Sequence, residues 1–155
     1  MHKGAVGIER MERVRQVRQG KDESLRDFES YVPIGSVVAK LKEWRNQGAE
    51  IIYLSSHRNP KDVEKDSHVL IRYDFPRGPI LFRKENETYG NVVDRALPDI
   101  LIEDDCESIG GEAEMAYPQI GTRVKEKVKS IVVKEFSGID YLPDDISALK
   151  EWHAS

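Results

Sequence analysis

The segment Ile51-Ile52-Tyr53-Leu54-Ser55-Ser56 carries the clearest secondary-structure signal in this chain. Its four large apolar residues run without polar alternation, which is typical of a strand buried on both faces of a parallel sheet. Two hydroxyl residues end the run. Asn59-Pro60 then follows, an N-cap residue with proline at the first helical position. The segment therefore predicts a buried strand that leads directly into a helix.

The alternation of strand and helix continues on both sides of this segment. Upstream, Ser36 predicts the N-cap of a helix that Gly48 ends. Alternating strands and helices indicate a parallel sheet with right-handed crossovers and helices on both faces. We therefore predict a three-layer α/β sandwich with a mostly parallel, Rossmann-like sheet. The further expected strands cover residues 79–82, 100–102 and 131–133, and the further expected helices cover residues 60–73, 88–96, 124–128 and 146–152.

The composition is that of one globular domain. A chain of 155 residues has a single-domain length. The 24 basic and 28 acidic residues give a net charge of −4, which argues against a dedicated nucleic-acid binder. One cysteine, Cys106, excludes an intramolecular disulfide framework. No apolar run approaches the ~18 residues of a membrane span, and the N-terminus lacks a signal-peptide core. We expect a cytoplasmic protein with no membrane partner.

Residues 1–32 differ from the rest because they are dense in charge and poor in large apolar groups. Residues 9–19 predict a helix that Gly20 ends, and residues 21–30 predict a loop or a short helix. Four arginines make this helix basic, but neighbouring glutamates offset them, so we expect a solvated helix face rather than an RNA-binding surface. These arginines are Arg10, Arg13, Arg15 and Arg18.

Polar side chains follow three successive predicted strands. Ser55 and Ser56 end the first, Lys84 follows the second, and Asp104-Asp105 follows the third. Ligands of such sheets bind beyond the carboxyl ends of the strands. Each feature alone has an ordinary reading as a turn or a solvated side chain. Together, a hydroxyl, an ammonium and two carboxylates suit a phosphate group and a Mg²⁺ ion.

These residues resemble three motifs of the haloacid dehalogenase-like (HAD-like) superfamily. Residues 48–56 resemble its second motif, a hydrophobic strand that ends in Ser or Thr. Lys84 resembles the third-motif lysine, and residues 100–105 resemble the fourth motif, an acidic pair. Their order along the chain is the family order, whereas two-component receiver domains place the acidic pair first. The resemblance covers about residues 33–143 and implies a HAD-like core without a large cap.

The resemblance implies a Mg²⁺-dependent phosphatase or related hydrolase that acts on a small phosphorylated metabolite. Ser55 and Lys84 are the implied catalytic residues: Ser55 would hold the phosphate, and Lys84 would neutralise it. Asp104 and Asp105 are the implied Mg²⁺ ligands.

Two further residues beside this motif are expected to bind the substrate. Ser56 and Arg58 lie on the same predicted edge, and the planar guanidinium of Arg58 suits a phosphate. His57 between them is a second candidate for contact with the substrate. The four histidines form no metal-spaced pair with Cys106, so a zinc site is not expected.

The first motif of the family, an Asp-x-Asp on an N-terminal strand that supplies the nucleophile, has no counterpart in this sequence. Two explanations stay open. Either the chain begins after that strand, or the protein has lost the motif and kept the fold. The alternative function is then a non-catalytic HAD-fold protein that binds a metal, a ligand or another protein. A missing strand also leaves an unpaired edge, which residues 5–8, or a homodimer partner, would fill.

Overall fold

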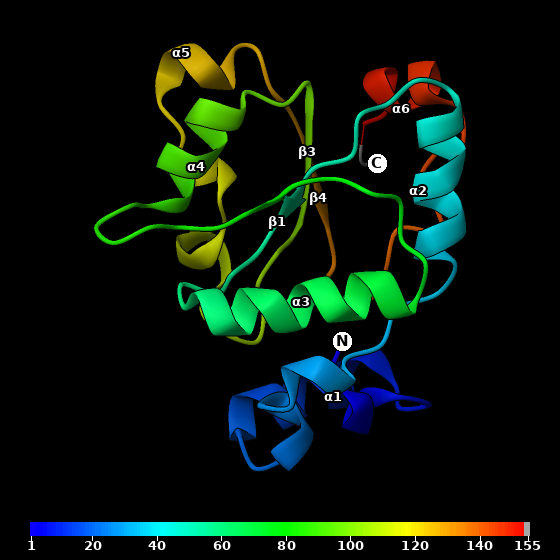
Figure 1. Ribbon diagram of the computed structural model, residues 1–155, viewed down its shortest axis with the longest axis vertical. Helices are drawn as coiled ribbons and strands as arrows, with labels where there is room; N and C mark the ends of the chain where they lie inside the picture. Colours follow the sequence, from blue (N-terminus) through cyan, green and yellow to red (C-terminus); the bar gives the residue numbers. More distant parts are fainter. Residues whose placement is uncertain (154–155) are drawn as a thin grey trace.

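The computed structural model describes residues 1–153 as a mixed α/β chain (Figure 1), which confirms the predicted class. Helices and strands alternate from residue 37 onward, as the sequence predicts. The helices are α1 (Arg10–Gln19), α2 (Val37–Asn46), α3 (Pro60–Arg72), α4 (Tyr89–Ala96), α5 (Thr122–Lys125) and α6 (Ile146–Glu151). The strands are β1 (Tyr53–Leu54), β2 (Ile80–Leu81), β3 (Ile100–Asp104) and β4 (Lys129–Val133).

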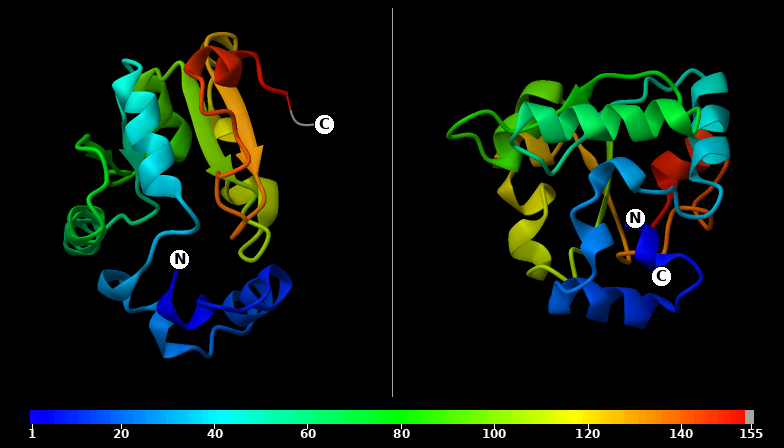
Figure 2. Two further views of the ribbon diagram at one scale, coloured as in Figure 1. Left: turned by 90° about the vertical axis from the view of Figure 1, so that its right-hand side faces the viewer. Right: turned by 60° about the horizontal axis from the view of Figure 1, so that its bottom comes forward.

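The strands form two parallel pairs rather than the single sheet that the sequence predicts. Strand β1 pairs with β2, with Tyr53 opposite Ile80, and β3 pairs with β4, with Ile102 opposite Ile131. Within the described residues no hydrogen-bond ladder joins the two pairs. The parallel orientation is thus confirmed, and the continuous sheet is not. Figure 2 shows β3 and β4 side by side, with their carboxyl ends pointing toward the N-terminal segment.

Local sequence signals fix several element ends. The Asn59 side chain accepts a hydrogen bond from the Lys61 amide at the start of α3. Thr88 and Asn91 form a reciprocal capping box at the start of α4. Gly20 ends α1 in the left-handed region, with φ of 62°. Because these signals act within a few residues, the predicted ends of these helices lie close to the observed ones.

Three local predictions need correction. The helix expected at residues 124–128 lies at Thr122–Lys125. Strand β3 continues through two acidic residues because the ladder to β4 continues: the Asp105 amide donates to the Val133 carbonyl at 3.0 Å. Ser36 precedes α2, but its hydroxyl donates to Asp140 instead of capping the helix.

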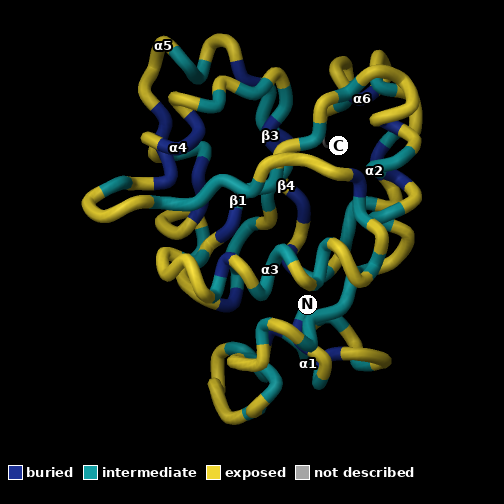
Figure 3. The backbone as a smooth tube through the Cα atoms, in the orientation of Figure 1, coloured by how far each residue is buried: buried dark blue, intermediate teal, exposed yellow. Residues whose placement is uncertain are grey.

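Two apolar clusters form the core, one packed against α4 and the other against α2 and α6 (Figure 3). One joins α4 to β3 and to the chain that leads into β4. Its buried members are Tyr89, Val93, Leu101, Ala116, Ile120 and Val128. The other joins α2 and α6 to β4, with buried members Trp44, Ile131, Val133, Leu142 and Leu149. Close packing requires glycine at Gly90, where a Cβ atom would lie 1.9 Å from the Gln119 carbonyl oxygen.

Residues 1–32 form a layer of their own across the carboxyl ends of β3 and β4 (Figures 1 and 2). Helix α1 and three short 3₁₀ helices build it, and Val14 and His2 are buried within it. The His2 ring lies 3.1 Å (Nε2 to Oε1) from Gln16 and meets Phe136 edge to face. No helix within residues 1–153 combines the length and the apolar character needed to cross a membrane.

Candidate functional site

Ser55 lies at the carboxyl end of β1, as predicted, but its hydroxyl already has partners. The residue is only 7% exposed. Its Oγ donates to Asp66 Oδ2 on α3 at 2.5 Å and accepts from the His57 amide at 3.1 Å. The His57 Nδ1 atom lies 3.0 Å from the same Asp66 oxygen. Asp66 lies eleven residues along the chain from Ser55 and is not among the site residues that the sequence predicts.

The N-terminal layer covers this group. The Phe28 ring lies 4.2 Å from the His57 ring, centroid to centroid. The Lys65 ammonium lies 5.6 Å from the centre of the same Phe28 ring, within cation–π range. Phe28 therefore packs between a β1-end residue and α3. The sequence gives a weak signal for this contact, since Phe28 is one of few large apolar side chains in residues 1–32.

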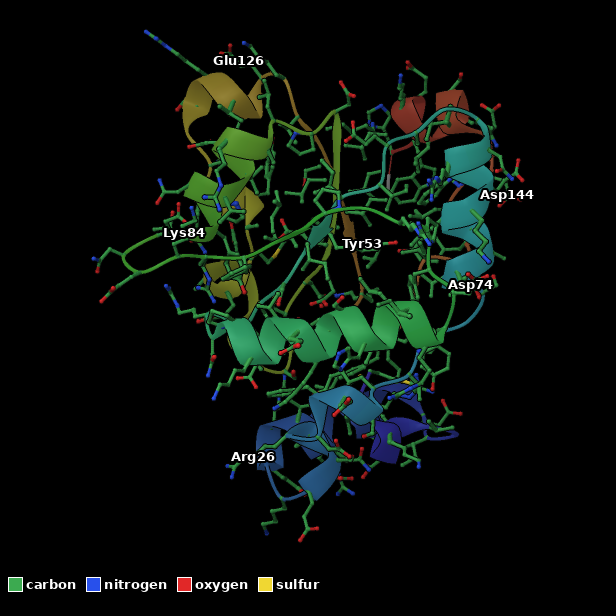
Figure 4. All side chains as sticks on the ribbon, in the orientation of Figure 1. Arg26, Tyr53, Asp74, Lys84, Glu126 and Asp144 are labelled. Atoms are coloured by element: carbon green, nitrogen blue, oxygen red, sulfur yellow. The ribbon has the colours of Figure 1, made fainter. Side chains whose placement is uncertain are left out.

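Lys84 lies on the exposed loop between β2 and α4 (Figure 4). Its amide donates to Glu87 Oε2 at 2.7 Å, and the Arg58 guanidinium donates to the Glu87 carbonyl oxygen at 3.2 Å. The Glu87 side chain also pairs with Arg95 at 2.6 Å. Lys84 and Arg58 therefore belong to one loop network organised by Glu87, apart from the Ser55 hydrogen bonds.

Arg83 is a cation at the end of β2 that the sequence analysis passed over in favour of its neighbour. Its guanidinium stacks 3.7 Å above the Tyr89 ring and donates to the Ser56 carbonyl oxygen at 2.9 Å. Among the described residues, its buried Nε atom has no hydrogen-bond partner. Arg83 thus ties the predicted substrate residue Ser56 to α4.

The acidic pair lies at the end of β3, as predicted, with its two members in different environments. Asp104 is exposed, and its Oδ1 accepts from the Cys106 amide at 2.8 Å. Asp105 binds the Lys134 ammonium at 2.9 Å and the Glu135 amide at 3.0 Å. Burial opposes ionisation of Asp105, but these hydrogen bonds outweigh it and lower the pKa of the carboxyl.

Two groups beside the acidic pair, one on β3 and one just after it, have raised pKa values. Burial raises the pKa of Glu103, although the Ala116 and Tyr117 amides donate to its carboxylate. Burial, followed by the charge of Asp104, raises the pKa of the Cys106 thiol to about 12. A thiol of that pKa is a poor nucleophile at neutral pH.

Three arginines of α1 bind the loops after β3 and β4. The expectation of a solvated helix face is wrong for Arg10 and Arg13, which are partly buried, whereas Arg18 makes its contact with a side chain that stays 54% exposed. Arg10 pairs with Glu107 at 2.9 Å and donates to the Glu135 carbonyl oxygen at 3.3 Å. Arg13 donates to the Phe136 carbonyl oxygen at 3.3 Å, and Arg18 to the Glu107 carbonyl oxygen at 3.0 Å. The fourth, Arg15, pairs within its own helix and stays exposed. The bound arginines fix the N-terminal layer to the acidic edge.

The donor set at β3 is compatible with a hydrated Mg²⁺ ion. Residues 1–153 contain no group of three or more His, Cys, Asp or Glu side chains placed to hold a metal. Mg²⁺ in phosphate sites commonly uses one or two carboxylates, with waters and phosphate oxygens for the rest. Exposed Asp104 suits that role. Asp105 suits it only in exchange for Lys134, which now neutralises its charge.

Comparisons of this chain with protein-family models, with curated proteins and with solved structures find no match.

Proposed function

We propose that this chain has a HAD-like core and serves a Mg²⁺-dependent phosphatase or related hydrolase of a small phosphorylated metabolite. The observation that carries the proposal is the position of the hydroxyl and the acidic pair. Ser55 and Asp104-Asp105 directly follow or end parallel strands of two different pairs. The carboxyl ends of parallel strands are where ligands of α/β proteins bind.

The strand pairing supports a three-layer HAD-like sandwich from which one strand is missing. The chain has the order β2-β1 in one pair and β3-β4 in the other, with no ladder between β1 and β3. One additional parallel strand between β1 and β3 would join the pairs into one sheet. In the resemblance to the HAD-like superfamily, the strand that is not found is the one that carries Asp-x-Asp.

Residues of opposite charge would bind different groups: the cations would bind the phosphate, and the carboxylates would bind the Mg²⁺ ion. Arg58 and Lys84, on the loops after β1 and β2, would attract and neutralise a phosphate group. Ser55 and Ser56 would position its oxygens. Asp104, with Asp105, would hold the ion, and bound Mg²⁺ supplies compensation of the charge on a phosphate ester.

Hydrolysis of p-nitrophenyl phosphate by the purified chain, with and without Mg²⁺, tests this function. Any Mg²⁺-dependent turnover should be abolished by Asp104→Asn. Turnover also requires a nucleophile, because the sequence contains no Asp-x-Asp. Asp94→Asn, an exposed aspartate on α4, is the matched control and should leave turnover unchanged. Thermal melting with millimolar Mg²⁺ gives a second measurement, because a ligand of the folded state raises Tm. A folded chain with neither turnover nor a Tm shift would overturn the proposal.

The second candidate is a non-catalytic HAD-fold protein, and one observation favours it. Polar groups at the strand ends already have partners within the chain: Ser55 pairs with Asp66 of α3, Asp105 with Lys134, and Glu107 with Arg10 of α1. A site ready for phosphoryl transfer would leave such groups free for substrate. This candidate predicts Mg²⁺ or phosphate binding without turnover. Homodimer formation through the free strand edges also stays a prediction, which light scattering after gel filtration tests.

A further inference from the structure

Ser55 and His57 together direct two hydrogen-bond donors at one carboxylate oxygen. Asp66 Oδ2 lies 2.5 Å from Ser55 Oγ and 3.0 Å from His57 Nδ1. An ionised carboxylate only accepts hydrogen bonds, so the hydroxyl and Nδ1 both carry the hydrogen that they direct at Asp66. Two convergent donors of this kind form a small site for an oxyanion.

The occupant of that oxyanion site is part of the protein. Asp66 reaches it from the middle of α3, and its side chain is 28% exposed, so the site opens to solvent on one side. The Ser55 hydroxyl has a single hydrogen to donate, and Asp66 uses it. A phosphate oxygen can therefore take the Ser55 hydrogen bond only in place of Asp66.

Charge adds to this competition. A phosphate beside Ser55 would lie next to the Asp66 carboxylate, and like charges in contact at a partly buried site are strongly unfavourable. Lys65, the cation that precedes Asp66 in the sequence, already pairs with Asp62 at 2.8 Å. Asp66 therefore weakens phosphate binding both by occupying the donors and by its charge.

We infer that Asp66 is a specificity-determining residue of this site, an internal carboxylate that competes with phosphate for the Ser55 hydroxyl and the His57 imidazole. The inference rests on the proposed function, since it assumes that Ser55 contacts phosphate. It adds a residue and an effect that the HAD-like motifs do not contain.

Titration of the full chain with inorganic phosphate, followed by amide NMR, tests the inference. Asp66→Asn keeps the shape of the side chain and removes its charge, and we expect phosphate to bind about tenfold more tightly, or about 1.4 kcal/mol. Asp94→Asn, which removes a carboxylate at an exposed site on α4, is the control for net charge, and it should change affinity little. Adding Ser55→Ala to Asp66→Asn should remove the gain.

The outcomes separate the inference from the proposed function. Phosphate binding that depends on Ser55 but is no tighter in Asp66→Asn overturns the inference and leaves the function standing. Equal gains in the two aspartate variants indicate a general charge effect and also overturn it. No phosphate binding by the wild type or by Asp66→Asn overturns both. If Asp66→Asn fails to fold, the wild type still decides, because phosphate must shift the Asp66 carboxyl ¹³C resonance and not that of Asp62.

Discussion

The strand ends of the two pairs carry opposite charges. Contacts between residues close in sequence stabilise one, and contacts between distant residues stabilise the other. Basic residues follow β1 and β2, among them Arg58 and Lys84, and acidic residues end or follow β3 and β4. The basic edge is held by near neighbours: Glu87 binds the Lys84 amide three residues away and Arg95 eight residues away. At the acidic edge, Glu107 binds Arg10 across 97 residues.

The difference teaches that the two edges depend on different parts of the chain. The polar contacts of the basic edge are made by a loop and the helix that follows it, and the N-terminal layer adds the packing of Phe28 on His57. At the acidic edge, α1 supplies the partners of Glu107 and of the loop carbonyl oxygens after β4. Loss of residues 1–32 would therefore leave negative charge uncompensated at the acidic edge. At the other edge it would remove the packing of Phe28 on His57 but leave the Glu87 contacts in place.

The largest expected effect tests how tightly the acidic edge is held. Glu135 is buried, and its carboxylate accepts from the Ser108 amide at 2.7 Å and from the Ser108 hydroxyl at 2.6 Å. Glu135→Ala should lower the free energy of unfolding by about 3 kcal/mol, because it leaves two buried donors unpaired. Urea unfolding measures this. Glu126→Ala, at an exposed site, should be near neutral, and equal losses would contradict the contrast.

The next effect concerns the contact of the N-terminal layer with the β1 end. Phe28→Ala removes the ring between His57 and Lys65 and should cost about 2 kcal/mol. Phe28→Leu keeps most of the apolar area and should recover much of that loss. Thermal melting of both variants checks this. A leucine variant as unstable as the alanine variant would mean that the aromatic geometry, rather than burial, is what matters.

A smaller effect comes from the arginine contacts. Arg10→Ala removes one ion pair and one carbonyl hydrogen bond and should cost about 1 kcal/mol in low salt. The cost should shrink in about 1 M NaCl, where screening acts over only a few ångströms. Arg15→Ala, which loses a pair within its own helix, is the control. Urea unfolding at two salt concentrations measures the free energy of unfolding of both variants. An equal salt response would contradict the expected difference between them.

The smallest effect is a pH dependence at Asp105. Its pKa is lowered in the folded chain, so its contribution is present above the unfolded pKa of about 3.9 and is lost as the pH falls through the folded value. Asp105→Asn should cost under about 1 kcal/mol at pH 7, since Lys134 is largely exposed. Unfolding at pH 7 and at pH 3 should show the variant approaching the wild type at the lower pH.

The sequence predicted what depends on neighbouring residues and missed what depends on distant ones. Caps such as Asn59 and Thr88 act within a few residues, so the helix starts could be read from the pattern. The approximate strand positions and their parallel orientation followed from the same local alternation. The position of Ser55 at a strand end was predictable, but its bond to Asp66 was not, because that bond depends on how α3 lies against β1.

The same limit explains the errors. A basic helix with nearby glutamates looks solvated in sequence, and only the tertiary structure brings Arg10 and Arg18 to Glu107. The single sheet failed because no hydrogen-bond ladder joins β1 to β3 within residues 1–153, and the alternation of elements along the chain reports only their order.

The unequal lengths of the two ladders have a consequence for hydrogen exchange. Strands β1 and β2 pair over two residues and β3 and β4 over five, so far fewer hydrogen bonds protect the first pair. Local opening of β1, β2 and the start of α3 then costs less free energy than opening of β3 and β4. Such local openings would separate Ser55 from Asp66 while β3, β4 and the acidic residues at their ends stay folded. Asp66 would then leave the Ser55 and His57 donors at a rate set by this local opening and not by global unfolding.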